Sequence, residues 1–266
     1  MLTRLLEGIG LFVGWRKQSD HEALFFLTLN QWLLSLCGGA WERPEAIRDL
    51  ECHAEARRFA RDYLEVSLRS GRSLSFLGPG RWLRHRNVAA LSDPWGWKDP
   101  RNTFTLPLWL DLFPDARVLH VYRHGVDVAQ SLRRRQRGVV RQRHERFHKL
   151  RRTYWFRAKQ VGPSVGLRCA SLAEGFALWE SYLRQGREQV RARGELGLEI
   201  SYESFLAEPA QTLAEVAGFC GLDVDRARCS RAVNGVRSDR RLAYRSDPEL
   251  VAFAEAVKDR LALHGY

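Results

Sequence analysis

The chain has 266 residues, of which 45% are hydrophobic and 28% charged, so it can bury a sizeable core, and its composition excludes wholly disordered, collagen-like and coiled-coil proteins. Lys and Arg outnumber Asp and Glu by 43 to 31, a formal net charge of +12. The five cysteines are odd in number and form no C-x-x-C pair. This pattern argues against a disulfide framework or a zinc site and favours a reducing, cytoplasmic location.

The positive charge is concentrated in one segment. Residues 133–152 hold ten Lys or Arg and one Glu, which accounts for most of the net charge. Such a run is most often a solvated helix face or loop, and the alternative is a surface that tracks phosphates along a nucleic acid. Phe147 is the one Phe, Tyr or Trp inside it, so the segment has few side chains on which nucleic-acid bases could stack. We therefore predict that this segment serves an anionic acceptor or surface, or has no partner, and that it binds no specific nucleic acid.

The first quarter of the chain predicts helices. Residues 2–6 look like part of a helix, and residues 45–70 like one long amphipathic helix with its apolar stripe at Leu50, Ala54, Phe59, Tyr63 and Val66. Residues 23–41 carry no formal charge. They contain too many polar and small residues for a membrane span and no basic segment of a signal peptide precedes them, so they predict a buried helix over 22–37.

From residue 95 onward, strands alternate with helices. We predict extended segments or strands at 95–97, 117–122 and 198–202 and helices at the following residues: 102–112, with Asn102 as its cap, 126–135, 171–193, 209–220, 225–233 and 248–263. Strands separated by helices favour an α/β fold in which helices flank a parallel sheet. No repeat or low-complexity linker divides the sequence, so we expect a single domain over residues 1–266.

Polar residues follow both clear strands at their carboxyl ends, where ligands bind in parallel sheets. Arg123 leaves the first strand, and Ser131 lies eight residues on, within the next helix. A strand–turn–helix arrangement can bring an Arg and a Ser onto one anion, the Arg as a charged fork and the Ser as a hydroxyl donor. The alternative is that Arg123 forms a surface ion pair and Ser131 is a solvated helix residue.

Three segments of this sequence together resemble one family. They read WKDPR from Trp97, FPDARVLHVYRHGVDVAQS from Phe113 and ISYESFLAEPAQTLAEVAGFCGL from Ile200. In this order they resemble the sulfotransferases that use 3′-phosphoadenosine 5′-phosphosulfate (PAPS), in the bacterial and tyrosylprotein-like branch. The resemblance implies a P-loop NTPase-like fold and the transfer of a sulfuryl group from PAPS to an acceptor hydroxyl or amine, without a metal.

The resemblance also implies roles for particular residues. Arg123 and Ser131 would bind the 3′-phosphate of PAPS, and Tyr202 would lie against the adenine, unless Tyr202 is a core residue at a strand end. Lys98 would neutralise charge on the bridging oxygen as the sulfuryl group departs, unless it is a surface lysine. Arg237, or Arg241 nearby, would be a later basic contact with the nucleotide, although a solvated basic loop fits these residues equally well.

A base must take the proton from the acceptor. In tyrosylprotein-type relatives an acidic residue follows the first helix, and the corresponding stretch here reads Ser19-Asp20-His21-Glu22. Glu22 is the expected base, with His21 and Asp20 as alternatives. Each of these residues could instead cap the following helix or compensate its dipole.

Members of the family open with a strand and an Arg-Ser-Gly-Thr-type loop that holds the 5′-phosphosulfate. This sequence begins with residues that look like the helix after that loop, so we expect the strand and loop to be encoded upstream of Met1, or the chain to be a poorly active product. The acceptor class stays open among small molecules, glycans, lipids and peptides, and the sequence carries no signal for oligomeric state. The alternatives are a non-catalytic nucleotide-binding remnant of the family and a nucleic-acid-binding protein that uses residues 133–152.

Overall fold

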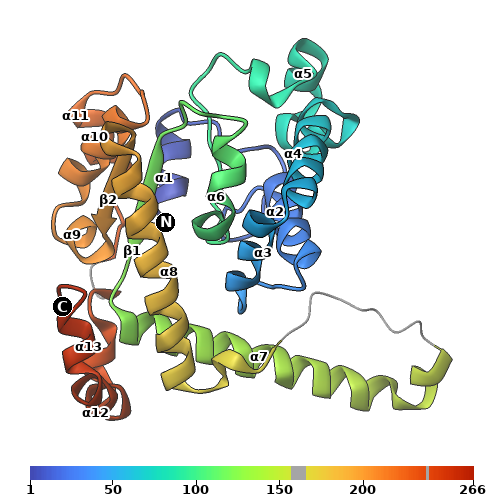
Figure 1. Ribbon diagram of the computed structural model, residues 1–266. Helices are drawn as coiled ribbons and strands as arrows, with labels where there is room; N and C mark the ends of the chain where they lie inside the picture. The colour runs from blue at the N-terminus through green and yellow to red at the C-terminus, as the bar shows by residue number, and fades with distance from the viewer. Residues whose placement is uncertain (157–165, 238–239) are drawn as a thin grey trace. The chain divides into compact units, whose positions relative to one another are not determined.

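The computed structural model describes residues 1–156, 166–237 and 240–266 and shows a helix-rich α/β protein. Within these residues, strands β1 (Val118–Tyr122) and β2 (Gly197–Ser201) pair side by side as a small parallel sheet (Figure 1). Both predicted strands are confirmed to within a residue or two, and so is the α/β class. The sheet is consistent with the P-loop NTPase-like fold.

The chain divides into two compact units. Unit 1 comprises Met1–Val121 and Gln185–Ser238, and unit 2 comprises Tyr122–Arg184 and Asp239–Tyr266. The prediction of a single domain over residues 1–266 is not tested by this division. Each unit is described below by itself.

Unit 1 begins with α1 (Leu2–Ile9) and α2 (Leu24–Leu36), which confirm the first two predicted helices. Helix α2 is a core element, because Phe26, Leu29, Leu33 and Leu34 along it are almost completely buried. The apolar character of this segment therefore serves packing against neighbouring helices of unit 1. None of the helices in the described part of the chain combines the length and the apolar character that crossing a bilayer requires.

The long helix predicted over residues 45–70 is wrong in its continuity and in its buried face. The segment forms η1 (Pro44–Arg48), α3 (Asp49–Cys52) and α4 (Ala54–Arg69), and it is interrupted at His53, where φ is −122° and ψ 89°. Phe59 and Val66, two members of the predicted stripe, are 53% and 67% exposed. The residues that α4 buries are Ala60, Leu64, Ser67 and Leu68. The interruption separates Leu50 from α4, so no single period of 3.6 residues spans the whole segment.

The remaining helices of this part are η2 (Gly71–Ser73), α5 (Leu74–His85), η3 (Val88–Ala90) and α6 (Asn102–Leu110). The predicted extended segment at 95–97 contributes an isolated parallel bridge between Trp95 and Phe12. Trp97 stacks on Phe26 with ring centroids 3.9 Å apart. The prediction that Asn102 caps α6 is wrong, since Arg101 occupies the cap position and the Asn102 side chain bonds elsewhere.

The second core of unit 1 gathers β2 and α1 with α9 (Tyr202–Ala207), α10 (Pro209–Phe219) and α11 (Arg226–Ala232), the last two close to the predicted helices. Between β1 and β2, His120 Nδ1 lies 3.1 Å from Glu199 Oε2, and Arg187 donates to the other Glu199 oxygen at 3.0 Å. Gly186 fits closely here, because a Cβ on it would come within 2.6 Å of the His120 ring.

Unit 2 is built on two long helices, α7 (Gly125–Leu150) and α8 (Leu172–Ala192), the latter ending in unit 1. The shorter elements are η4 (Arg151–Phe156), η5 (Arg168–Ala170), η8 (Ala243–Ser246), α12 (Pro248–Ala256) and α13 (Lys258–Ala262). Val126, Phe176, Trp179 and Leu250 lie in its core. The predicted helix over 248–263 is broken at Val257, and the predicted helix over 126–135 is too short by more than half.

Candidate functional site

Glu22 and Lys98 are in direct contact. Lys98 Nζ donates to Glu22 Oε1 at 2.8 Å, although the two residues are 76 positions apart in sequence. The Glu22 side chain is only 8% exposed, whereas that of Lys98 is 37% exposed. The structure thus brings together the two residues predicted to be catalytic, a buried carboxylate and an ammonium group that solvent can reach.

Arg101 and Asp99 extend this pair into a four-residue cluster. Arg101 lies with one guanidinium nitrogen 3.6 Å from Glu22 Oε2 and 2.8 Å from Asp99 Oδ1. The two cations offset the cost of burying the Glu22 carboxylate, which would be high for a lone charge. Burial raises the pKa of the Asp99 carboxyl above its usual value, and Arg101 opposes this shift. Hereafter Glu22, Lys98, Asp99 and Arg101 are called the carboxylate–lysine cluster.

The fully buried side-chain amide of Asn30 is hydrogen-bonded to this cluster. Asn30 on α2 donates to Asp99 Oδ2 at 2.9 Å and to Asn102 Oδ1 at 2.8 Å. Its oxygen accepts hydrogen bonds from Thr105 Oγ1 and Trp109 Nε1, both at 2.8 Å. All four hydrogen-bonding positions of the amide are therefore used, as a buried amide requires. Asn30 therefore joins α2 to α6. It also holds Asp99, which in turn orients Arg101.

The loop before α2 determines which of the three candidate bases faces Lys98. The Gln18 amide donates to the Glu22 carbonyl at 2.9 Å, and Lys17 bridges to Ala23, so the loop closes on itself. His21, at φ 62°, turns to Glu7, with its Nδ1 3.3 Å from Glu7 Oε2. Asp20 is exposed. Glu22 is thus the one of the three whose side chain contacts Lys98 within the described residues.

Arg123 lies in unit 2, directly after β1. Its guanidinium donates to Asp127 Oδ2 and to the Arg240 carbonyl, both at 2.8 Å, and its own carbonyl accepts from Trp179 Nε1 at 2.9 Å. The side chain is 28% exposed. The ion pair that the sequence offered as the alternative is therefore present, and it fixes the direction of the guanidinium while leaving part of it open to solvent.

Asp127 organises the turn around Arg123. Besides Arg123, it accepts hydrogen bonds from the backbone amides of Ala243 and Tyr244. The neighbouring His124 stacks on the Tyr244 ring with centroids 4.4 Å apart. Burial lowers the pKa of His124 to about 4, with nearby arginines acting in the same direction and Asp127 opposing them. His124 is consequently neutral at pH 7.

The other residues predicted to contact the nucleotide differ in their exposure to solvent and in the unit to which they belong. Ser131 is exposed on the second turn of α7, where its hydroxyl bonds to no other described residue. Tyr202, in unit 1, is the half-buried first residue of α9 and packs on the core that contains β2. Arg237 and Arg241 are exposed. A combined nucleotide site from these residues, Arg123 included, stays a prediction.

Three residues of these clusters, Asp99, Arg101 and Asp127, were not predicted as site residues, although all three lie within motifs that the sequence analysis used. Arg101 ends the WKDPR segment, and Asp127 lies between Arg123 and Ser131. The spacing within the second motif could have indicated Asp127, because an acid four residues after an arginine at the start of a helix can pair with that arginine. Asn30 was read only as a polar residue that argued against a membrane span.

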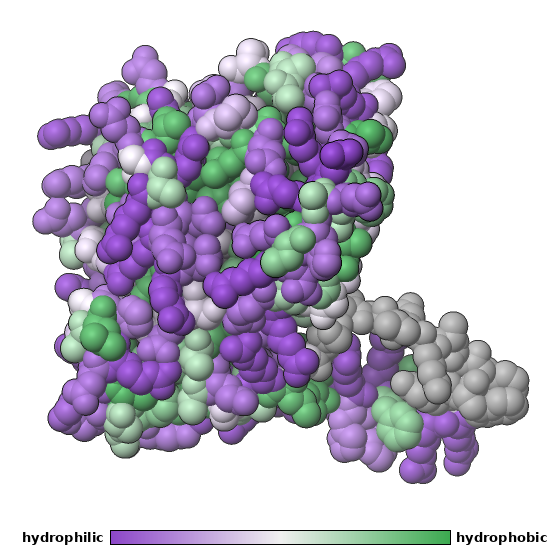
Figure 2. Space-filling view, in the orientation of Figure 1, coloured by the Kyte–Doolittle hydropathy of each residue, from purple (hydrophilic) through white to green (hydrophobic). Residues whose placement is uncertain are grey.

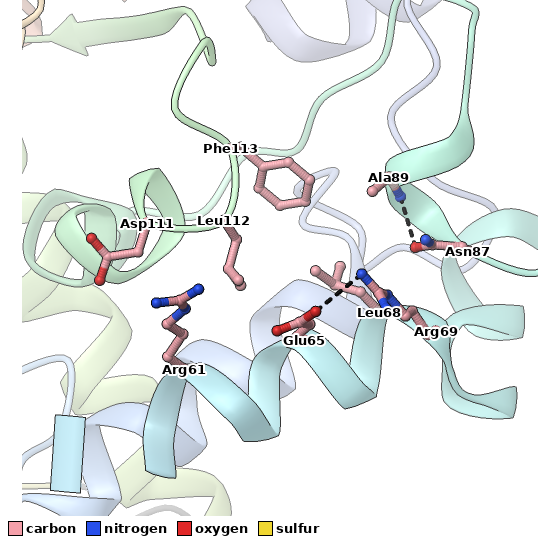
Figure 3. Close-up of a pocket in the computed structure, with 9 residues that line it drawn as sticks. All are labelled: Arg61, Glu65, Leu68, Arg69, Asn87, Ala89, Asp111, Leu112 and Phe113. Atoms are coloured by element: carbon pink, nitrogen blue, oxygen red, sulfur yellow. Dashed lines mark hydrogen bonds and ion pairs between the residues drawn. The ribbon is translucent and has the colours of Figure 1, made fainter. Parts of the chain in front are cut away.

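The structure also shows a shallow hollow of about 200 Å³ in unit 1, lined by residues other than the predicted site residues (Figure 3). Residues from α4, the η3 region and the end of α6 line it, and its charged side chains are two arginines and two acids, Arg61, Arg69, Glu65 and Asp111. None of the predicted site residues is among them. Among the described residues, no group of three His, Cys, Asp or Glu side chains is placed to hold a metal ion.

A comparison with protein families identifies one match. The family model that matches is described as the sulfotransferase family, and the match covers residues 40–226, more than two thirds of the chain. This range contains Lys98, Arg123, Ser131 and Tyr202, and Glu22 lies before it. No curated protein and no solved structure matches the chain.

Proposed function

The chain belongs to the sulfotransferase family, and we propose that it transfers a sulfuryl group from PAPS to an acceptor hydroxyl or amine. The observation that carries the proposal is the contact between Glu22 and Lys98. A base and a cation within one hydrogen bond of each other supply the two functions that this transfer needs from a protein.

In the proposed reaction, the acceptor oxygen or nitrogen attacks the sulfur, and the bond from sulfur to the oxygen of the 5′-phosphate breaks. The acceptor's proton passes to Glu22, and 3′,5′-ADP leaves. Lys98 stabilises the negative charge that develops on the leaving oxygen, and its contact with Glu22 holds the ammonium group in place for this role. Positioning and charge stabilisation therefore account for most of the catalysis, as in phosphoryl transfer.

The nucleotide would be held by Arg123, Ser131, Tyr202 and Arg237. Arg123 suits a phosphate because Asp127 orients its guanidinium and part of that group remains exposed. Ser131 offers a hydroxyl that no other described residue uses. PAPS acts here as a co-substrate.

The test is the conversion of PAPS to 3′,5′-ADP by the full chain, with acceptor phenols, sugars, peptides and lipids supplied in turn. Glu22→Gln keeps the size of the side chain and removes the base, so kcat should fall at least 100-fold. Lys98→Gln should also lower kcat about 100-fold. Asp20→Asn, which removes a neighbouring exposed carboxylate, is the matched control and should leave kcat within twofold.

Three results would decide against parts of the proposal. Turnover by Glu22→Gln equal to that of the unmodified chain would exclude Glu22 as the base. Nucleotide binding without transfer to any acceptor would favour the non-catalytic remnant. Absence of both binding and transfer would contradict PAPS as the donor.

A further inference from the structure

The second half of α7 is mostly exposed to solvent, whereas the first half packs in the core of unit 2. From residue 137 to residue 150, every side chain except those of Val139 and Leu150 is exposed, and Gly138 has none. This stretch contains five cations and one acid, Glu145; the cations are Arg137, Arg141, Arg143, Arg146 and Lys149. Figure 2 shows the corresponding end of the helix, at lower right, as mostly hydrophilic with a small hydrophobic area.

The first arginine of the basic run does not belong to this surface. Arg133 is almost completely buried and donates to both carboxylate oxygens of Glu249 on α12, at 2.5 and 2.8 Å, and to Gln130 at 2.8 Å. The solvated helix face that such a run most often forms therefore does not include Arg133. This residue ties α7 to α12, and the exposed part of the helix begins after it.

Two apolar side chains lie on the exposed stretch. Val140 is 46% exposed and Phe147 44% exposed. They are seven residues apart, which is two helical turns, so they form one stripe. At 100° per residue, Arg137 and Arg141 lie on one side of this stripe and Arg143 and Arg146 on the other. Hereafter residues 137–150 are called the α7 surface.

A hollow beside the stripe suits an oxyanion. Arg134, Arg137 and Arg141, which follow one another on a single face, line a space of about 230 Å³ together with Gly138. Among the described residues, nothing lies within 4 Å of the position that a Gly138 Cβ would take, so the glycine leaves the space between the arginines open. Guanidinium groups bind phosphate oxygens in pairs, and three of them around one space favour a phosphate group.

We propose that the α7 surface binds the phosphate headgroups of an anionic lipid bilayer, lying in the plane of the interface. The arginines would contact the phosphates, and Val140 and Phe147 would enter the boundary between headgroups and acyl chains. Apolar side chains flanked on both sides by cations distinguish this occupant from a nucleic acid, which would require several stacking aromatics or base-reading groups. The chain would lie on the membrane and not cross it.

The experiment is co-sedimentation of the full chain with vesicles at low and physiological salt. Vesicles of equal parts phosphatidylglycerol and phosphatidylcholine should bind the chain, and vesicles of phosphatidylcholine alone should not. The triple variant Arg137→Gln, Arg141→Gln and Arg146→Gln should bind the anionic vesicles about 100-fold more weakly, at roughly a fivefold loss per cation. The matched control changes three exposed arginines of unit 1, Arg58→Gln, Arg61→Gln and Arg84→Gln, and should retain binding.

A second variant separates lipid from other polyanions. Val140→Ser with Phe147→Ser keeps every charge, and it should bind anionic vesicles at least tenfold more weakly while its weak affinity for mixed-sequence RNA is unchanged. Circular dichroism checks that each variant retains its helix content. Unchanged vesicle binding by this variant, equal losses in the two triple variants, or no binding of the unmodified chain to anionic vesicles would overturn the proposal, and tighter binding to RNA than to vesicles would replace it with a nucleic-acid surface.

Discussion

Asn30 lies at the base of the carboxylate–lysine cluster, and its amide satisfies four hydrogen bonds in a position with no solvent exposure. From it, contacts run through Asp99 and Arg101 to Glu22. Since each partner is buried, a change at one would leave another polar group without compensation. The direction of the Glu22 carboxylate thus depends on residues of α2 and α6 that do not themselves face Lys98.

His124 gives the stability of the protein a pH dependence. Its pKa is about 4 in the folded chain against 6.5 for an ordinary histidine, so the unfolded chain takes up the proton first as the pH falls. The stabilisation is complete above pH 6.5 and is lost between pH 6.5 and 4, by up to about 3 kcal/mol. Urea unfolding of the unmodified chain and of His124→Phe at pH 7 and pH 4.5 should show a smaller loss in the variant, and equal losses would contradict the assignment.

The site residues predicted from the sequence share one property: each lies in a short motif whose residue types are tied to a chemistry. Lys98, Arg123, Ser131 and Glu22 were all identified in this way. What the motifs did not indicate is pairing over long sequence distances, such as Arg133 with Glu249, or Asn30 with Asp99. Such pairs depend on how helices are packed in space, which local spacing does not encode.

At the scale of elements, α7 is the clearest departure from the sequence interpretation. The helix was expected to stop at residue 135, shortly after the basic run begins, but it continues to Leu150. Arginine and glutamine are good helix formers, and no proline interrupts the stretch. In contrast, the break at His53 carries no glycine or proline signal, so the periodic pattern over 45–70 concealed it. Most predicted helices exist, but α5 and α9 were not predicted, and several helix ends were placed wrongly.

Two glycines of α7 offer a matched test of its packing. A Cβ on Gly125 would lie within 2.7 Å of the Phe176 and Trp179 rings on α8, whereas a Cβ on Gly138 would meet nothing. Gly125→Ala should therefore destabilise the chain by about 1–3 kcal/mol through overpacking. Gly138→Ala should stabilise it by about 0.4–1 kcal/mol, because it lowers the entropy of the unfolded chain.

Thermal unfolding followed by circular dichroism measures both changes. The two substitutions are chemically identical and lie on one helix, so each serves as the control for the other. A lower Tm for Gly138→Ala, or an unchanged Tm for Gly125→Ala, would show that the packing of α7 differs from the one described.

At the scale of the whole molecule, most of the net charge of +12 comes from residues 133–152, which hold ten Lys or Arg and one Glu. The sequence located this charge and the family, and a family model that covers residues 40–226 confirms the latter. The α/β class also followed from the alternation of strands and helices. The sequence pattern did not predict the division into two compact units, because no linker of distinctive composition marks it.

The most direct test of the proposed donor is calorimetric titration of 3′,5′-ADP into the unmodified chain, Arg123→Ala and Ser131→Ala. Ser131 is exposed and bonds to no other described residue, so its replacement leaves the fold intact. Ser35→Ala, an exposed helix serine of unit 1, is the matched control. We predict that the unmodified chain binds the nucleotide, that Arg123→Ala weakens binding by about 1.5–3 kcal/mol, and that Ser131→Ala weakens it while Ser35→Ala does not. Equal affinity in all four proteins, or no binding by the unmodified chain, would contradict a PAPS-dependent activity built on these residues.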